Sequence, residues 1–263
     1  MGLVFITVIL LFAIIGYFWT PYPPNATNSK AMLLPPGTAG HIFGTDDMGR
    51  DILSRLMAGA SISITVGIFS VLFAMIVGTI LGLTSGYYRG AVGAVIDKVI
   101  EAIWAFPSLI LAMVLTVLIG SGIRNVIIAL AIVQIPSFAR IVRAMTLSIR
   151  ENEYIQSAVT IGLNNAQIMF RYILPNVISV IIVQASLCAA SAIIQESTLS
   201  FLGLGIVPPD ASWGAMLKLG YMYLDSAPWL SVIPGVCIVL MVLGLNFLGD
   251  GFRDALDVKI RNF

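Results

Sequence analysis

The sequence predicts an all-α membrane protein with six transmembrane helices. Of its 263 residues, 59% are apolar and only 10% are charged, whereas soluble domains carry about 25% charged residues. The apolar residues gather in six runs, and a helix of about 20 such residues crosses the hydrocarbon core of a bilayer. Lipid offers no partners to open strand edges, so runs of this kind indicate helices. The same composition excludes a disordered chain, which needs low hydrophobicity and high charge.

The apolar runs place the six spans along the chain. The first, residues 3–19, is short for a span, and Trp19 and Tyr22 at its end suit a membrane interface. A signal peptide is the alternative, but no Lys or Arg precedes this run and no A-x-A-like cleavage site follows it. The remaining spans are predicted at residues 57–83, 103–119, 126–139, 177–194 and 229–248. We therefore divide the chain into residues 1–56, with the first span and an external loop, and a five-helix core of residues 57–263.

The distribution of Lys and Arg predicts the orientation of these spans. Six spans put both termini on one side, and the segments on that side hold nine of the 14 basic residues, against five on the other side. Basic loops stay in the cytoplasm, so both termini are expected there. The external segments are then residues 20–56, 120–125 and 196–228. A net charge of only +1 indicates no nucleic-acid partner.

The cytoplasmic segment between the fourth and fifth spans carries the most informative pattern. Apolar residues recur there at helical spacing from Ile155 onward. Gly162 is expected to end this short helix with a positive φ. Asn164, with Gln167 three residues later, is typical of a capping box that begins a second helix. We predict a short amphipathic helix, a glycine turn and a second helix that runs into the fifth span.

The polar face of this short helix indicates what it binds. A helix that rests on lipid carries Lys and Arg on its polar face. No basic residue lies between Glu151 and Phe170, where the polar residues are Glu, Asn, Gln, Ser and Thr. This composition favours docking to a protein over docking to a membrane surface.

The segment resembles the EAA loop of binding-protein-dependent ABC importer permeases. In that family, Glu-Ala-Ala is followed by three residues, Gly, nine residues and Ile-x-Leu-Pro. Four residues match in register: Ala158, Gly162, Leu174 and Pro175. Gln156 and Ser157 stand in place of Glu and Ala. The resemblance implies that a loop at about residues 145–175, including Glu153, couples this chain to an ATPase.

Three further stretches resemble the C-type subunit of dipeptide, oligopeptide and nickel permeases. They read HIFGTDDMGRDILSRLMAGASIS, ESTLSFLGLGIVPPDASWGAML and NFLGDGFRDALDVKIR. The resemblance implies a type I ABC importer permease fold in a bacterial or archaeal cytoplasmic membrane. It also implies that the chain forms half of a translocation path, with a homologous B-type permease, one or two ABC ATPase subunits and an external substrate-binding protein as partners beside the membrane lipid. Peptides are the expected substrate, with nickel or a metal–chelator complex as the alternative.

The chain itself carries no signature of ATP hydrolysis. A phosphate-binding loop needs Gly-Lys followed by Ser or Thr, and none of the four lysines follows a glycine. We therefore expect a non-catalytic subunit without a cofactor, with ATP and Mg²⁺ bound by the partners. The chain has only one His, and its two Cys lie within apolar runs. These residues therefore indicate no metal site.

Polar residues in the spans and in the first external loop are the remaining candidates. Intramembrane polar groups face either protein or a water-filled path, so five residues are candidates for pathway lining or for hydrogen bonds between helices: Gln134, Gln184, Ser191, Gln195 and Glu196. In the loop, Asp46 and Asp47 are expected to cap the helix that leads into the second span. Together with Arg50 and Asp51, they are also candidates for contact with the external binding protein.

Two other classes of function are disfavoured. An ion-driven secondary transporter usually shows internal repeats and charged or broken helices near the midplane. Here no repeat is evident, and no acidic residue falls in the middle of a predicted span. A membrane enzyme would need a nucleophile–base pair or a metal set beside the spans, whereas the only histidine, His41, lies in an external loop.

Overall fold

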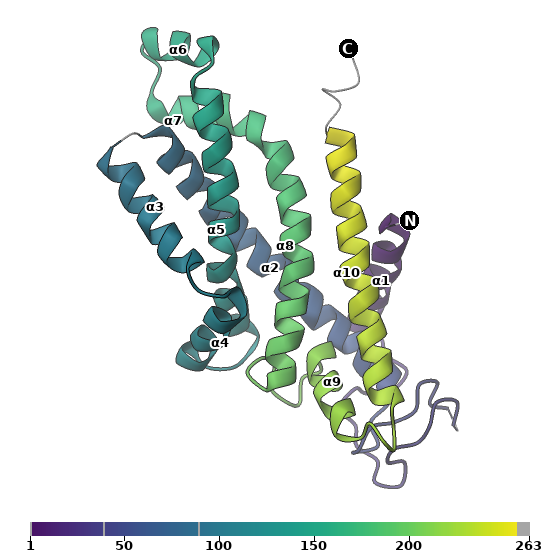
Figure 1. Ribbon diagram of the computed structural model, residues 1–263. Coiled ribbons are helices and arrows are strands. Elements are labelled where there is room, and N and C mark those ends of the chain that lie inside the picture. Colours follow the sequence, from purple (N-terminus) through teal and green to yellow (C-terminus); the bar gives the residue numbers. More distant parts are fainter. Residues whose placement is uncertain (1, 39, 89, 257–263) are drawn as a thin grey trace.

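The computed structural model describes residues 2–38, 40–88 and 90–256, with side chains from residue 7 onward, and its regular elements there are helices. These are α1 (Gly2–Phe18), α2 (Ile52–Tyr87), α3 (Ala91–Trp104), α4 (Ser108–Ile119), α5 (Ile123–Arg150), α6 (Glu153–Thr160), α7 (Asn165–Gln167), a π-helical segment (Ile168–Ile173), α8 (Leu174–Leu202), α9 (Trp213–Met222) and α10 (Trp229–Leu256). The long helices run side by side, with α6 at one end of the bundle and α9 at the other (Figure 1). The start of α1 and the end of α10 point toward the α6 end.

Four helical segments are long and apolar enough to cross a membrane. They are α2, α5, the continuous stretch Asn165–Leu202, and α10. The predicted third span is not a straight helix, because α3 and α4 meet at an angle of 92°. Pro107 precedes α4, and a proline disfavours helical geometry in the residue before it. Counted as one span, this bent pair brings the total to five within the described residues.

The first predicted span forms α1, which has only 17 residues. This is shorter than the about 20 residues that a span needs. The structure therefore confirms four to five of the six predicted spans, and α1 packs against α2 and α10.

Two helices extend beyond the apolar runs from which their spans were predicted. Helix α2 begins at Ile52, so the division after residue 56 falls inside its second turn. Helix α5 continues to Arg150 instead of ending near residue 139. In both cases a polar, amphipathic stretch extends the helix beyond its apolar run, because hydrogen bonding along a helix does not require apolar residues.

Helices α2 and α5 pack so closely that their backbones lie near each other. A Cβ atom on Gly78 would lie 2.6 Å from Cβ of Phe138, and one on Gly82 would lie 2.6 Å from the carbonyl oxygen of Ala139. These glycines are four residues apart and therefore lie on one face of α2. Small residues at such a spacing allow helices in membranes to pack closely.

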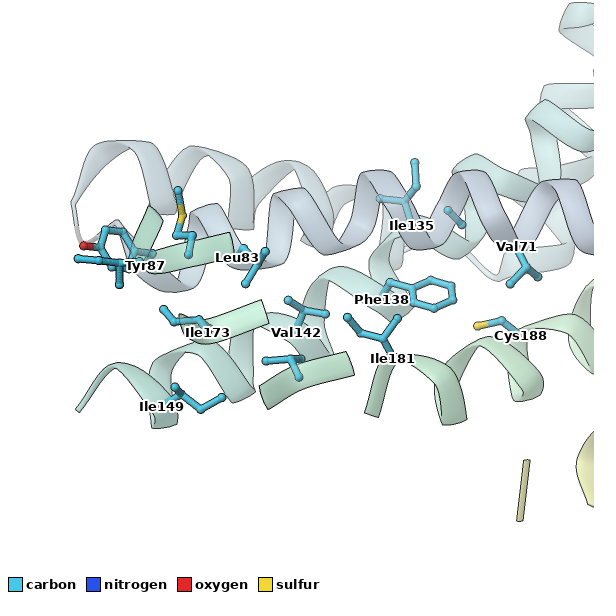
Figure 2. Close-up of a cluster of buried hydrophobic side chains, with 14 of the residues drawn as sticks. Val71, Leu83, Tyr87, Ile135, Phe138, Val142, Ile149, Ile173, Ile181 and Cys188 are labelled. Atoms are coloured by element: carbon cyan, nitrogen blue, oxygen red, sulfur yellow. The ribbon is translucent and has the colours of Figure 1, made fainter. Parts of the chain in front are cut away.

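A cluster of buried apolar side chains joins α2, α5 and α8 and extends to α6. Figure 2 shows Phe138 and Val142 of α5 between side chains of α2 and Ile181 of α8. The buried residues Ile155 and Ala158 of α6 belong to the same cluster. Helix α6 is thus held by the core that holds the spans.

The connection between α8 and α10 contains a further helix, α9. Ser212 caps the ten-residue helix α9 by accepting a hydrogen bond from the Ala215 amide. Trp213 is buried, and its Nε1 donates to the carbonyl oxygen of Leu56 at 3.1 Å. This bond ties α9 to the start of α2.

Candidate functional site

Helix α6 presents one buried face and one exposed face. Ile155 and Ala158 point into the core, whereas Glu153, Gln156 and Ser157 are exposed. Gln156 Nε2 also donates to the carbonyl oxygen of Arg150 at 3.0 Å, which joins α6 to the end of α5. The short helix predicted here is confirmed, and its polar residues lie on the face that is open to a partner.

The turn after α6 has the geometry that the sequence predicted. Gly162 has a φ of +86°. The Gly162 amide donates to the Val159 carbonyl, and the Leu163 amide donates to the Ala158 carbonyl. This pair of bonds is a Schellman motif, which left-handed glycine favours.

The predicted capping box follows this turn and is confirmed. Asn164 accepts a hydrogen bond within α7, and its amide donates to Gln167 Oε1 at 3.2 Å. The hydroxyl of Tyr87, at the end of α2, donates to Asn165 Oδ1 at 3.0 Å. This hydrogen bond therefore joins the start of α7 to the end of α2.

Leu174 and Pro175 lie where the π-helical segment passes into α8. Pro175 is the second residue of α8 and follows the π-helical segment closely. The helical path from Asn165 to Leu202 is unbroken. Continuous helix therefore joins the α6–α7 turn to the base of α8.

Ala158, which matches the EAA pattern, does not lie on the exposed face of α6. Its exposed fraction is 5%, and it packs into the protein's own core. The exposed face instead carries the apolar side chains of Tyr154, Val159 and Ile161, and Ile161 is 80% exposed. Sequence reasoning missed these residues, although three large apolar side chains off the buried face of an amphipathic helix are the signal of a docking surface.

Four of the five candidate pathway residues line a single cavity of about 370 Å³. They are Gln134 of α5 and Gln184, Ser191 and Gln195 of α8. Trp104 and Phe106, at the bend between α3 and α4, line the same cavity. Neither aromatic residue was among the predicted site residues, although a proline directly after an aromatic residue signals such a break.

Glu196 does not line this cavity. It is buried and accepts hydrogen bonds from Ser63 of α2 at 3.0 Å and from Ser200 at 2.8 Å. The structure thus places Glu196 in the helix–helix hydrogen bonding that was the alternative to pathway lining.

The charged residues of the loop between α1 and α2 hold this loop together. Asp46 accepts from the Met48 and Arg50 amides and from Arg50 Nε at 2.6 Å. Asp51, instead of Asp46 or Asp47, caps α2 by accepting from the Ser54 amide at 2.8 Å, which corrects the predicted cap.

These bonds decide which loop residues can meet another protein. Asp51 also pairs with His41 Nδ1 at 2.8 Å. Asp46 and Asp51 are buried, which contradicts their expected contact with an external protein. Asp47, the most exposed of the four candidates, remains available for such a contact.

Comparison with known families identifies the class to which this arrangement belongs. The family described as binding-protein-dependent transport system inner membrane component matches residues 74–262, and the N-terminal TM domain of oligopeptide transport permease C matches residues 1–36. The chain belongs to the permease subunits of binding-protein-dependent ABC importers. Among these subunits it is a C-type permease of the dipeptide and oligopeptide transporters. Permeases of this type are non-catalytic components of the inner membrane that cross it several times. A component of this kind works with ATPase subunits and a binding protein.

Several relatives share close to the whole chain. The dipeptide transport system permease protein DppC of Alkalihalophilus pseudofirmus is 44% identical over 99% of this chain and 86% of its own length. The glutathione transport system permease protein GsiD of Pectobacterium atrosepticum is 44% identical over 97% of this chain and 85% of its own length. The di/tripeptide transport system permease protein DppC of Pseudomonas aeruginosa is 38% identical over 99% of this chain and 88% of its own length.

A solved structure shares the fold. A chain of the inward-facing MetNI methionine ABC transporter superimposes with a TM-score of 0.62, over 76% of this chain and 95% of that chain, at 20% identity. At this identity the likeness concerns the fold alone. It supports an importer permease architecture for the α2–α10 bundle.

Proposed function

We propose that this chain forms half of the translocation path of an ATP-driven importer of short peptides and that a homologous B-type permease forms the other half. The observation that carries the substrate class is the high identity to permeases named for dipeptides, di/tripeptides and glutathione. Nickel or a metal–chelator complex is the second candidate, which the sequence resemblance left open.

The proposed topology has six spans in a bacterial or archaeal cytoplasmic membrane, with both termini in the cytoplasm. Helix α1 and the bent α3–α4 pair each count as one span in this type I permease fold, and residues 57–263 supply five of the six. The arrangement in Figure 1, where α6 and the end of α10 lie at the same end of the bundle, supports this topology. Membrane lipid then surrounds the exposed apolar side chains of the long helices, and nucleic acid has no part in the function.

The proposed coupling runs through α6. One or two ATPase subunits bind and hydrolyse ATP with Mg²⁺, and this chain binds no cofactor. Their closure pushes on the exposed face of α6, and the turn at Gly162 passes the movement to the base of α8. The continuous helix Asn165–Leu202, whose middle lines the cavity, supports this route. The external binding protein delivers its ligand at the opposite end, near Asp47 and α9.

Transport by the reconstituted complex tests this function. Vesicles that hold the two permeases, the ATPases and the external binding protein should take up a labelled dipeptide when ATP is supplied, without any ion gradient. The purified single chain should hydrolyse no ATP. Uptake that needs an ion gradient and not ATP would contradict the importer. Uptake of nickel but not of peptides would replace the proposed substrate.

The proposed topology predicts which residues a membrane-impermeant thiol reagent reaches. In a variant that lacks Cys188 and Cys237, Lys30→Cys should react from outside the cell. Ile161→Cys should react only after the membrane is permeabilised, because α6 faces the cytoplasm. Both side chains are exposed in the chain, and the variants are produced without the ATPase subunits, which would cover Ile161. A failure to react would therefore reflect the membrane and not burial. The opposite pattern would remove the importer function, since α6 would face away from ATP.

A further inference from the structure

Gln134 is a polar side chain without a partner inside the bundle. Its exposed fraction is 4%, and within the described residues neither Oε1 nor Nε2 forms a hydrogen bond. Burial of an amide without a hydrogen-bond partner is unfavourable. Buried polar groups in folded proteins are almost always hydrogen-bonded. An amide that lines a cavity without a hydrogen-bond partner therefore indicates that a ligand in the cavity supplies the partner.

Helix α8 supplies a second unpartnered group to the same cavity. Gln195 Nε2 donates to Ser191 Oγ at 2.9 Å, and this leaves Gln195 Oε1 without a partner among the described residues. Gln184, Ser191 and Gln195 are seven and four residues apart and therefore share one face of α8. From Gln184 to Gln195 this face is about 16 Å long, at 1.5 Å per residue. An extended peptide of about five residues has this length.

The lining of the cavity carries dipoles and no charge. Its described residues include three glutamines and three serines among apolar and aromatic side chains, and none is Asp, Glu, Lys, Arg or His. A metal ion would lack carboxylate or imidazole ligands in this lining. A peptide group has one hydrogen-bond donor and one acceptor, and a side-chain amide can form a hydrogen bond with each of them. The volume of about 370 Å³ lies within the range of small-ligand pockets.

We propose that this cavity is a binding site for the main chain of a peptide in transit, with Gln134 and Gln195 forming hydrogen bonds to its peptide groups. The inference rests on the proposed import of peptides. Recognition through the main chain is independent of the substrate's side chains, which pack against Trp104 and Phe106 at the α3–α4 bend. The site therefore selects for peptide bonds and tolerates varied sequences.

The test compares two substrates in two proteins. The substrates are trialanine and its analogue in which an ester oxygen replaces one peptide N–H, each supplied on saturating binding protein whose affinity for both is measured separately. The wild-type complex should transport trialanine about fivefold faster than the ester, because one hydrogen bond between neutral groups is lost. In Gln134→Leu the two rates should be equal, because the partner of that N–H is gone.

Matched variants isolate the effect. Thr146→Val removes a buried hydroxyl from the same helix, where it bonds within α5 to the Val142 carbonyl and lies outside the cavity. It should keep the wild-type preference for trialanine. Gln195→Leu should lose the preference over the analogue that carries the ester at the other peptide bond of trialanine, and it decides the question if Gln134→Leu does not assemble.

Each contrary outcome has a distinct meaning. Peptide transport with no preference for trialanine in the wild type, or with the same preference in both Gln→Leu variants, would overturn the binding site and leave peptide import intact. Loss of the preference for trialanine in Thr146→Val would also overturn the binding site. No transport of trialanine by the wild type would overturn the proposed peptide import, and the binding site with it.

Discussion

Gly78→Val should prevent the stable folding of the permease. The new side chain would place its Cβ 2.6 Å from Cβ of Phe138 and 2.8 Å from the carbonyl oxygen of Ile135. One of these two atoms belongs to the backbone of α5, so the clash is relieved only if the two helices separate. Overpacking of a closely packed core costs about 1–3 kcal/mol and sometimes more. We expect the upper end of that range, because the separation would also open the cluster around Phe138.

The measurement is the yield of monodisperse protein and its thermal unfolding in detergent. Gly251→Val is the matched control, since it makes the same substitution in α10 at a position with no atom within 4 Å of the added Cβ. We expect wild-type behaviour for Gly251→Val and a large loss of folded protein for Gly78→Val. Equal stability of the two variants would show that the close approach of α2 and α5 is not needed for the fold.

Gly162→Val should reduce both transport and ATP hydrolysis by the assembled complex. A Cβ on Gly162 would meet no atom within 4 Å, so the effect is conformational and not steric crowding. A β-branched residue at a φ of +86° is strained by roughly 1 kcal/mol or more. The Schellman motif would be lost and the exposed face of α6 would be misplaced. Transport and binding-protein-stimulated ATP hydrolysis by the complex should fall together, by about tenfold, if the misplacement removes about 1.4 kcal/mol of docking energy.

Two further variants separate strain from surface chemistry. Gly162→Asn should retain most activity, because asparagine tolerates the left-handed conformation. Ile161→Asp changes an 80% exposed side chain without straining the turn, and it should weaken recovery of the ATPase subunits in a pull-down. Ligand binding by the external protein should be unchanged in all three variants. Full transport with normal ATPase recovery in both Gly162→Val and Ile161→Asp would show that α6 is only a surface loop.

Local signals in the sequence predicted the coupling segment well. The ends of α6 and the start of α7 depend on residues within four positions of one another, such as Gly162 and the pair Asn164 and Gln167. These caps form the same bonds in many structures, because the orphan amides and carbonyls at a helix end need partners wherever the helix lies. Composition alone likewise indicated a membrane protein, since a chain with 10% charged residues cannot cover a soluble surface.

The lengths and shapes of the spans were less predictable. Apolar runs mark the part of a helix that is in lipid, and they missed the polar extensions of α2 and α5. The bend before Pro107 was visible as a proline inside an apolar run, but hydropathy does not distinguish a straight span from a bent one. The six spans counted from hydropathy include α1, whose 17 residues lie at the short end of the range for a span.

Tertiary structure alone decided which polar residues are free to act. Glu196 bonds to Ser63, which is 133 residues away, and is thereby removed from the pathway. Ala158 is buried by packing of α6 on the core, while Gln134 is left unpaired beside α8. Residue type and spacing indicate that a side chain is polar and which face of its helix it occupies. Whether that face meets a partner, a cavity or solvent depends on which helices become neighbours, and that follows from close approaches such as the one at Gly78 and Gly82.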